Sequence, residues 1–255
     1  MNLILVDADQ VAPDGTVSLD GTRAEHIVRV LKAAPGDRLR IGVLDGLAGE
    51  GIVIAASPTQ VTLHCQFDRP APPPAVDLLL ALPRPKVLRR LWAQLAALGV
   101  GRILLTNASR VERNYFDTHL LDEGTYRPLL VEGLQQARDT RVPQVLVRRQ
   151  FKILVEDELG ALFPEGLRLV ADPGAVRPVR VVVQDAAPRR VLLAVGPEGG
   201  WTRYELDLLA AHGFHAGAAG SRPLRTDTAC VALLTLVHDA LTVVRPAAAG
   251  GRDRM

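Results

Sequence analysis

Aromatic residues and cysteine are scarce in this chain of 255 residues. Phe, Trp and Tyr make up 4% of it, so a core must come mainly from the Leu, Val and Ala among its 48% apolar residues. The two cysteines, Cys65 and Cys230, lie in different segments without metal-ligand spacing. We expect both to be small buried residues, as in a protein of the reducing cytosol. The six histidines also lack such spacing, so no metal site is predicted.

Long apolar runs are missing as well, and we expect the first residues to form a strand, not a signal peptide. No apolar run reaches the ~18 residues that a membrane-spanning helix needs, so we expect no membrane partner. The first seven residues have no basic segment and no cleavage site, and they are typical of a strand. The disorder signature of low hydrophobicity with high net charge is also missing. We therefore expect a folded, cytoplasmic protein.

Charge is distributed unevenly along the chain. The formal net charge is only +2, yet residues 84–113 hold seven basic residues and one acid. Such a patch can attract phosphates, although a solvated helix face explains the charge alone equally well. The seven basic residues are Arg84, Lys86, Arg89, Arg90, Arg102, Arg110 and Arg113.

A proline-rich segment divides the chain. The sequence Arg69-Pro70-Ala71-Pro72-Pro73-Pro74 resists both helix and central strand, and it predicts a stiff connector. Before it, short β-type runs alternate with turn signals, which favours a small β-barrel over residues 1–70. After it, strands and helices alternate over residues 75–245, which predicts a parallel α/β sheet with helices on both faces. The tail 246–255 is predicted to be disordered.

The expected elements follow from periodicity and from start and stop signals. A capping box, Thr202-Arg203-Tyr204-Glu205, opens one helix, and Gly213 closes it. The predicted strands are 3–6, 16–19, 39–44, 51–55, 61–66, 76–82, 102–106, 144–147, 167–171, 191–195 and 214–218. The predicted helices are 24–31, 87–98, 119–138, 202–213 and 226–244.

A glycine-rich loop follows the strand at 191–195. Gly196-Pro197-Glu198-Gly199-Gly200 would stand at its carboxyl end, where ligands bind in open parallel sheets. We expect these glycines to let the backbone approach a ligand and adopt positive φ, and the next helix to present its amino end to a carboxylate. The loop matches neither GxGxxG nor Walker A, which disfavours a dinucleotide or NTP. A tight structural turn is the alternative.

A second loop follows the strand at 214–218. It reads Ala219-Gly220-Ser221-Arg222-Pro223-Leu224-Arg225 and continues into Thr226-Asp227. Two arginines and an acid between a strand and a helix suggest that two neighbouring strand-end loops enclose one ligand. The alternative is helix capping by Thr226 and Asp227 beside solvated arginines.

Together the two loops resemble the paired motifs of the ribosomal RNA small-subunit methyltransferase E family, within the SPOUT class. Residues 196–201, Glu205 and 222–229 carry this resemblance, and it extends over nearly the whole chain. Ala219, Pro223 and Asp227 depart from the Leu, Ile and Glu that the family usually has. Further matches are residues 25–31, 36–37 and 98–100, with Lys86, Gln94, Arg110, Gln135, Gln136, Arg138, Arg141 and Pro143.

The resemblance implies an α/β protein with a PUA-like N-terminal β-barrel and a C-terminal SPOUT domain that contains a trefoil knot. It also implies S-adenosylmethionine as cofactor, a homodimer, and methylation at N3 of one uridine in the 16S ribosomal RNA of the small subunit. The predicted cofactor-binding residues are Ala171, Val195, Gly196, Pro197, Glu198, Gly199, Gly200, Ala219, Gly220, Arg222, Pro223, Leu224 and Thr226. The predicted RNA-binding residues are Arg84, Lys86, Arg89, Arg90, Arg110 and Arg141.

Arg225 and Glu198 are the predicted catalytic residues. Uracil N3 is a poor nucleophile until its proton leaves, and the resulting negative charge spreads onto the carbonyl oxygens. Arg225 can stabilise that charge but cannot act as the base, since arginine stays protonated. A protein base would be a carboxylate, Glu198 or Asp227, although either can be purely structural.

Two other functions stay open at this point. One is a SPOUT methyltransferase acting on another RNA, such as transfer RNA. The other is an RNA-binding PUA-like protein whose knotted domain has lost activity, against which the intact Gly196, Gly199, Gly200 and Arg225 count.

The helix at 226–244 is apolar on more than one face, which indicates deep burial or an interface. We expect it to form the homodimer contact, with an ordinary core helix as the alternative.

Overall fold

The computed structural model describes residues 2–220 and 222–244, which form two compact units. One unit holds residues up to Pro73 together with Leu130–Val142, and the other holds Pro74–Leu129 and the described residues from Pro143 onward. The segment Leu130–Val142 therefore belongs with the N-terminal part, although the sequence placed it in the C-terminal domain. The tail predicted at 246–255 lies outside the described residues.

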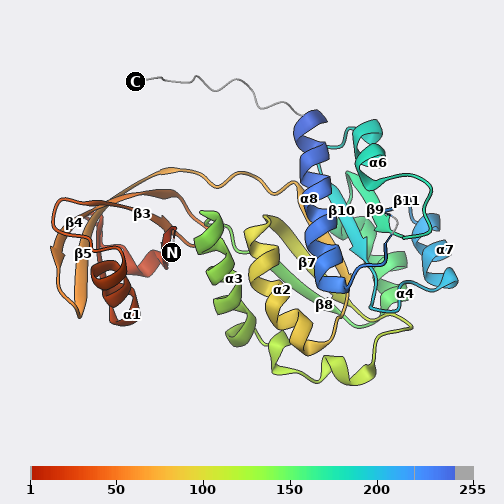
Figure 1. Cartoon of the computed structure of the whole chain (residues 1–255), viewed down its shortest axis with the longest axis horizontal. Helices are drawn as coiled ribbons and strands as arrows, with labels where there is room; N and C mark the ends of the chain where they lie inside the picture. The colour runs from red at the N-terminus through yellow and green to blue at the C-terminus, as the bar shows by residue number, and fades with distance from the viewer. Residues whose placement is uncertain (1, 221, 245–255) are drawn as a thin grey trace. The chain divides into compact units, whose positions relative to one another are not determined.

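The N-terminal unit is built on a five-stranded sheet (Figure 1). Its order is β1-β3-β4-β5-β2, and only the β1–β3 pair in this sheet is parallel. Val17 and Leu19 alternate with exposed residues and face a core that includes Ile27 of the helical stretch. The strands are β1 (Ile4–Val6), β2 (Thr16–Asp20), β3 (Arg38–Val43), β4 (Ala48–Ala56) and β5 (Gln60–Arg69); the helical turns are η1 (Ala8–Gln10), α1 (Gly21–Glu25) and η2 (His26–Val30).

Hydrogen bonds explain why Leu130–Val142 belongs to this unit. The Thr140 hydroxyl donates to the Gly46 carbonyl at 2.7 Å, and the Val142 amide donates to Asp45 Oδ1 at 2.9 Å. The Arg141 guanidinium donates to the Ala71 carbonyl at 3.0 Å. These contacts join residues 70 or more positions apart, which local sequence patterns do not reveal.

The second unit contains a six-stranded sheet in which every neighbouring pair is parallel (Figure 1). The strand order is β11-β9-β10-β6-β7-β8. All residues of the two central strands, β6 and β10, are buried, as expected for a parallel sheet covered on both faces. The predicted parallel α/β arrangement is confirmed. The strands are β6 (Val76–Ala81), β7 (Val100–Thr106), β8 (Gln144–Arg148), β9 (Leu167–Ala171), β10 (Val191–Val195) and β11 (Phe214–Gly217).

Most helices lie where the apolar periodicity predicts them. Leu88, Leu91 and Leu95 of α2 form a buried face, and Gly99 with φ of 71° follows the helix end. The sequence missed α6, because its run of valines is typical of a strand, and it missed the helical segment from α4 to α5. The helices and helical turns are α2 (Pro85–Ala97), η3 (Arg113–Phe116), η4 (His119–Leu121), α3 (Glu123–Ala137), α4 (Phe151–Ile153), η5 (Leu154–Glu158), α5 (Leu159–Leu162), α6 (Val179–Ala186), α7 (Arg203–Ala211) and α8 (Thr226–Val244).

Helix α8 is long and apolar enough to cross a membrane by length and composition alone. Its residues Cys230, Leu234 and Val237 are buried, and the helix packs on α6, α2 and β10. The core helix of a globular protein passes the same test, so its length is weak evidence for a membrane span.

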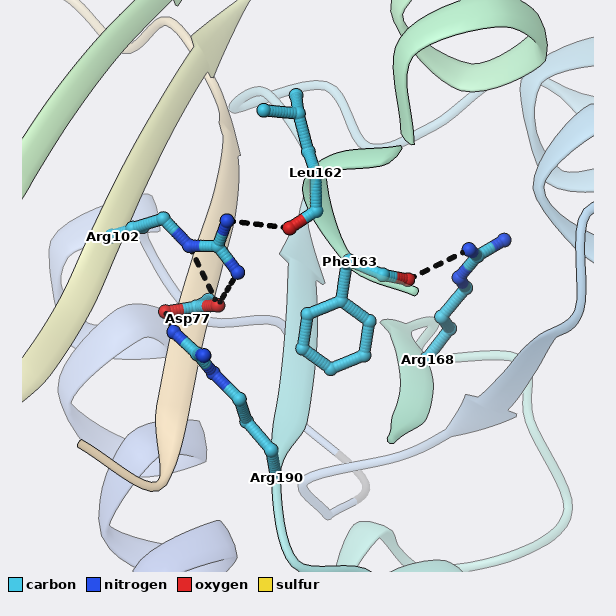
Figure 2. A network of polar contacts seen from close by, with 6 residues as sticks. All are labelled: Asp77, Arg102, Leu162, Phe163, Arg168 and Arg190. Atoms are coloured by element: carbon cyan, nitrogen blue, oxygen red, sulfur yellow. Dashed lines mark hydrogen bonds and ion pairs between the residues drawn. The ribbon is translucent and has the colours of Figure 1, made fainter. Parts of the chain in front are cut away.

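Near the amino ends of the central strands lies a buried carboxylate, Asp77 of β6, with no exposed surface. Arg102 of β7 donates to Asp77 Oδ2 through Nε at 3.1 Å and Nη2 at 2.8 Å. Arg190, just before β10, donates to Oδ1 at 2.9 Å (Figure 2). Arg102, which the sequence counted in the basic patch, therefore neutralises a charge inside the fold.

Arginines beside Asp77 also bind carbonyl groups at the end of α5 (Figure 2). Arg102 also donates to the Leu162 carbonyl at the end of α5, and Arg168 donates to the Phe163 carbonyl at 2.9 Å. A second nitrogen of Arg168 donates to the His212 carbonyl beyond α7 at 2.8 Å. Helix C-termini leave such carbonyls without intrahelical partners, so these arginines join strand edges to helix ends.

Replacing Asp77 tests the importance of this network. Asp77→Asn leaves two partly buried guanidinium groups without their carboxylate, and breaking a buried ion pair costs about 3–5 kcal/mol. We expect urea unfolding to show that loss. The exposed pair of Arg203 and Asp207 is the matched control; Asp207→Asn should cost less than about 1 kcal/mol. Equal effects of the two substitutions would contradict this account of Asp77.

Candidate functional site

A cavity of about 350 Å3 lies at the carboxyl ends of β9, β10 and β11. These strands are neighbours in the sheet, so the loops that follow them meet at one edge. The volume is in the range typical of small-molecule sites. The structure brings all thirteen predicted cofactor-binding residues to this cavity: Ala171, Val195, Gly196, Pro197, Glu198, Gly199, Gly200, Ala219, Gly220, Arg222, Pro223, Leu224 and Thr226.

The sequence missed part of the cavity wall. Asp172 and Pro173 directly follow Ala171, the predicted site residue at the end of β9, and β9 lies between β10 and β11. That strand order is not visible in the sequence. The other missed lining residues are Trp201, Leu206, Gly217, Ala229 and Leu233.

The glycines of the first loop serve different needs. Gly200 has φ of 73°, as expected. Gly196 and Gly199 do not have positive φ, and both lie close to a side chain instead. A Cβ on Gly196 would lie 3.1 Å from the indole of Trp201, and one on Gly199 would lie 2.9 Å from Arg110 Cδ. The expectation of positive φ was therefore wrong for these two residues.

A buried glutamate fixes the exit from this loop. Glu205 is 2% exposed, and its Oε2 accepts the Thr202 amide at 2.7 Å and the Thr202 hydroxyl at 2.8 Å. This is the predicted capping box of α7. Its Oε1 accepts the backbone amide of Ser109 at 2.7 Å. The carboxylate thus joins the start of α7 to the loop after β7.

Two arginines contact the glycine-rich loop from neighbouring segments. Arg110, next to Ser109, donates to the Gly199 carbonyl. The Arg84 amide donates to Glu198 Oε1 at 3.2 Å, and Arg84 Nε donates to the Tyr115 hydroxyl at 3.1 Å. The hydrogen bond with Tyr115 and the charge of Glu198 raise the pKa of Arg84. Arg84 is therefore an oriented cation at this loop.

Tyr115 is held on the other side as well. Its hydroxyl donates to Glu112 Oε1 at 3.2 Å. Burial raises the pKa of Tyr115 above its ordinary value of 10.0. The hydroxyl therefore stays protonated near neutral pH and keeps this donor role.

The two carboxylates considered as a base differ in their surroundings. Asp227 Oδ2 accepts a hydrogen bond from Arg90 at 2.6 Å, and Oδ1 accepts the Thr228 amide at 3.0 Å. The hydrogen bond from Arg90 lowers the pKa of Asp227. Glu198 is exposed at the cavity and accepts the Arg84 amide. Glu198 thus keeps an exposed carboxylate at the cavity, whereas the carboxylate of Asp227 is engaged with Arg90.

The predicted cations do not form one group. Arg225 is exposed, and its carbonyl accepts the Ala229 amide at 2.7 Å; among the described residues it is not part of the cavity wall. Lys86 and Arg89 are exposed on α2. Arg141 belongs to the other compact unit. No group of three or more His, Cys, Asp or Glu suited to a metal is present within residues 2–220 and 222–244.

Comparison with known families assigns the class of protein. The RNA methyltransferase domain matches residues 70–238, and the RNA methyltransferase PUA domain matches residues 19–64. The parallel sheet and its strand-end cavity both lie within the first match. The fold and the cavity are therefore those of an RNA methyltransferase.

Individual relatives narrow the class. Over 244 residues the chain is 30% identical to the ribosomal RNA small subunit methyltransferase E of Treponema pallidum, covering 93% of this chain and 90% of the relative. Over 248 residues it is 23% identical to ribosomal RNA small subunit methyltransferase E 1 of Borreliella burgdorferi, covering 91% and 95%. The chain belongs to the ribosomal RNA small subunit methyltransferase E family, which confirms the resemblance of its two loops.

A solved structure shares the fold. The crystal structure of a ribosomal RNA small subunit methyltransferase E from Neisseria gonorrhoeae, bound to S-adenosyl methionine, matches with a TM-score of 0.72 at 19% identity. The match covers 94% of this chain and 97% of that one.

Arg90 gives a pH test of the site. In Arg90→Ala, the pKa of Asp227 should rise toward its ordinary value of 3.8, because the hydrogen bond that lowers it is gone. In the wild type the pair of Arg90 and Asp227 stabilises the fold at pH values above the ordinary pKa of aspartate. This stabilisation is lost as the pH falls through the lowered pKa of Asp227. Carboxyl-carbon NMR titration measures the shift. Lys86→Ala, on the exposed face of the same helix, is the control, and an unchanged Asp227 in Arg90→Ala would contradict the assignment.

Proposed function

We propose that this chain transfers a methyl group from S-adenosylmethionine to N3 of a specific uridine in the 16S ribosomal RNA of the small subunit. The observation that carries the proposal is the cavity at the ends of β9, β10 and β11. Both loops that resemble the family's paired motifs line it. Membership in the ribosomal RNA small subunit methyltransferase E family supports the substrate class.

The lining residues fit the proposed cofactor. Leu206, Leu224 and Leu233 offer apolar walls for an adenine ring. Glycines in both loops leave backbone groups accessible to a ribose or a carboxylate. Thr226 at the start of α8 also lines the cavity, where a helix amino end favours a carboxylate. When bound, the cofactor supplies an electrophilic methyl group on its sulfonium.

The chain's own residues would prepare the uridine. Glu198 is positioned at the cavity to accept the N3 proton, and Asp227 is engaged with Arg90. Removal of that proton leaves negative charge on the uracil carbonyl oxygens. Arg225, exposed on the loop beside the cavity-lining Leu224 and Thr226, would stabilise this charge. Methyl transfer is an in-line displacement, so the protein contributes mainly positioning.

RNA contacts are proposed at the predicted cations. Arg84 and Arg110 touch the glycine-rich loop, and Lys86 and Arg89 present exposed charge on α2. We propose that these residues bind phosphates that flank the target uridine. Arg141 would add a phosphate contact from the PUA-like unit. Arg90 is exposed, so it would bind a phosphate while it stays paired with Asp227.

Several finer features are part of the same proposal. We propose that the five-stranded sheet closes into a PUA-like barrel, that residues 75–245 form a SPOUT domain with a trefoil knot, and that the enzyme works in the cytoplasm. A homodimer is supported by α8, where Val231, Leu236 and Val243 stay partly or fully exposed. No metal is needed for this chemistry.

Cofactor binding and product identity test the function. Calorimetry with a chelator present should show S-adenosylmethionine binding, and Gly200→Val should abolish it, since a β-branched residue is strained at φ of 73°. Gly124→Ala, with open space around its Cβ, is the control. Nucleoside mass spectrometry of treated small subunits should then show 3-methyluridine. A folded wild type that binds no cofactor, or that methylates transfer RNA instead, would contradict the proposal.

Two arginines should separate catalysis from binding. Arg225→Ala should reduce the single-turnover methylation rate by about 10²–10³ with little change in cofactor affinity, because its contribution is largest in the transition state. Arg89→Ala should weaken RNA binding and reduce its salt dependence by roughly one unit of slope. If Arg225→Ala keeps its rate and loses only RNA affinity, Arg225 is a phosphate contact and not a catalytic residue.

A further inference from the structure

Glu205 is a buried charge that the proposed chemistry does not use. Its carboxylate accepts three hydrogen bonds of 2.7–2.8 Å, two from Thr202 and one from Ser109. Burying a carboxylate is costly unless donors surround it, and hydrogen bonds to an ionised group are strong. A capping box needs only the reciprocal contacts between Glu205 and Thr202. The contact with Ser109 therefore requires a further reason.

The contacts of Glu205 close a ring around the cofactor loop. Ser109 is followed by Arg110, whose guanidinium donates to the Gly199 carbonyl and whose Cδ lies against Gly199. From Gly199 the chain runs through Gly200 to Thr202, which returns to Glu205. Gly199 lines the cavity, whereas Arg110 is exposed. A movement of the loop at residues 196–200 is thus transmitted through Glu205 to the loop that holds Ser109 and Arg110, and the reverse.

We infer that Glu205 is a positioning residue that couples cofactor binding to RNA binding by holding Arg110 against the cofactor loop. The inference rests on the proposed function, because the two ligands are those named there. Cofactor contacts that order residues 196–200 also order Arg110 for a phosphate. By linkage, RNA at Arg110 then favours the cofactor by the same factor.

Glutamine is the informative substitution at this position. A capping box accepts Gln as well as Glu, so Glu205→Gln can keep an oxygen toward Thr202. Its amide NH2 must then face the Ser109 amide, where donor meets donor. The substitution therefore releases the loop after β7 and retains the cap of α7.

The experiment measures binding of purified small ribosomal subunits with and without S-adenosylhomocysteine, the product form that has no methyl group to transfer. In the wild type the ligand should tighten subunit binding about 5-fold or more, within the usual range of coupling between sites. Glu205→Gln and Arg110→Ala should each bring this ratio close to one. The double variant should lose no more than either single variant, because both act in one ring.

The controls separate positioning from folding. Asp207→Asn makes the same carboxylate-to-amide change at an exposed position of α7 and should keep the wild-type ratio. Arg110→Ala leaves the buried carboxylate intact, so it tests the inference even if Glu205→Gln unfolds. A wild-type ratio in Arg110→Ala, or additive losses in the double variant, would overturn the coupling and leave the proposed function standing. A wild type that binds no S-adenosylhomocysteine would overturn both.

Discussion

Parallel pairing of β9, β10 and β11 is the constraint on which this molecule depends. Parallel strands end at the same edge of a sheet, so the three loops that follow them meet although they lie up to about 50 positions apart in sequence. The cavity forms from these loops and from the start of α8. No single loop encloses it. The strand order of the sheet therefore has to form before any side chain of the site can act.

Two buried carboxylates stabilise the structure at opposite ends of the strands of this sheet. Asp77 lies near the amino ends of the central strands and neutralises Arg102 and Arg190. Glu205 lies beyond the carboxyl ends and accepts backbone and hydroxyl donors near the cavity. The first joins strands to helix ends, and the second joins loops to each other.

The sequence predicted much of this arrangement, and what it missed has physical causes. Apolar periodicity and glycine signals located the strands, α2, α7 and α8, and all thirteen predicted cavity residues line one site. Strand order was not predictable, because it depends on contacts distant in sequence. The ion pairs of Arg90 with Asp227 and of Arg102 with the buried Asp77 were not predicted either. Charge composition does not reveal which residues pair. Helix α6 was not predicted, because its valines favour strands locally and packing overrides that preference.

The central claim is that this chain methylates N3 of a uridine in 16S ribosomal RNA. Its most direct measurement is nucleoside mass spectrometry of 16S RNA from cells that lack the chain. The account predicts that 3-methyluridine disappears from that RNA and returns when the wild-type chain is restored, but not when Gly200→Val is supplied. Unchanged 3-methyluridine in the deletion strain would contradict the claim.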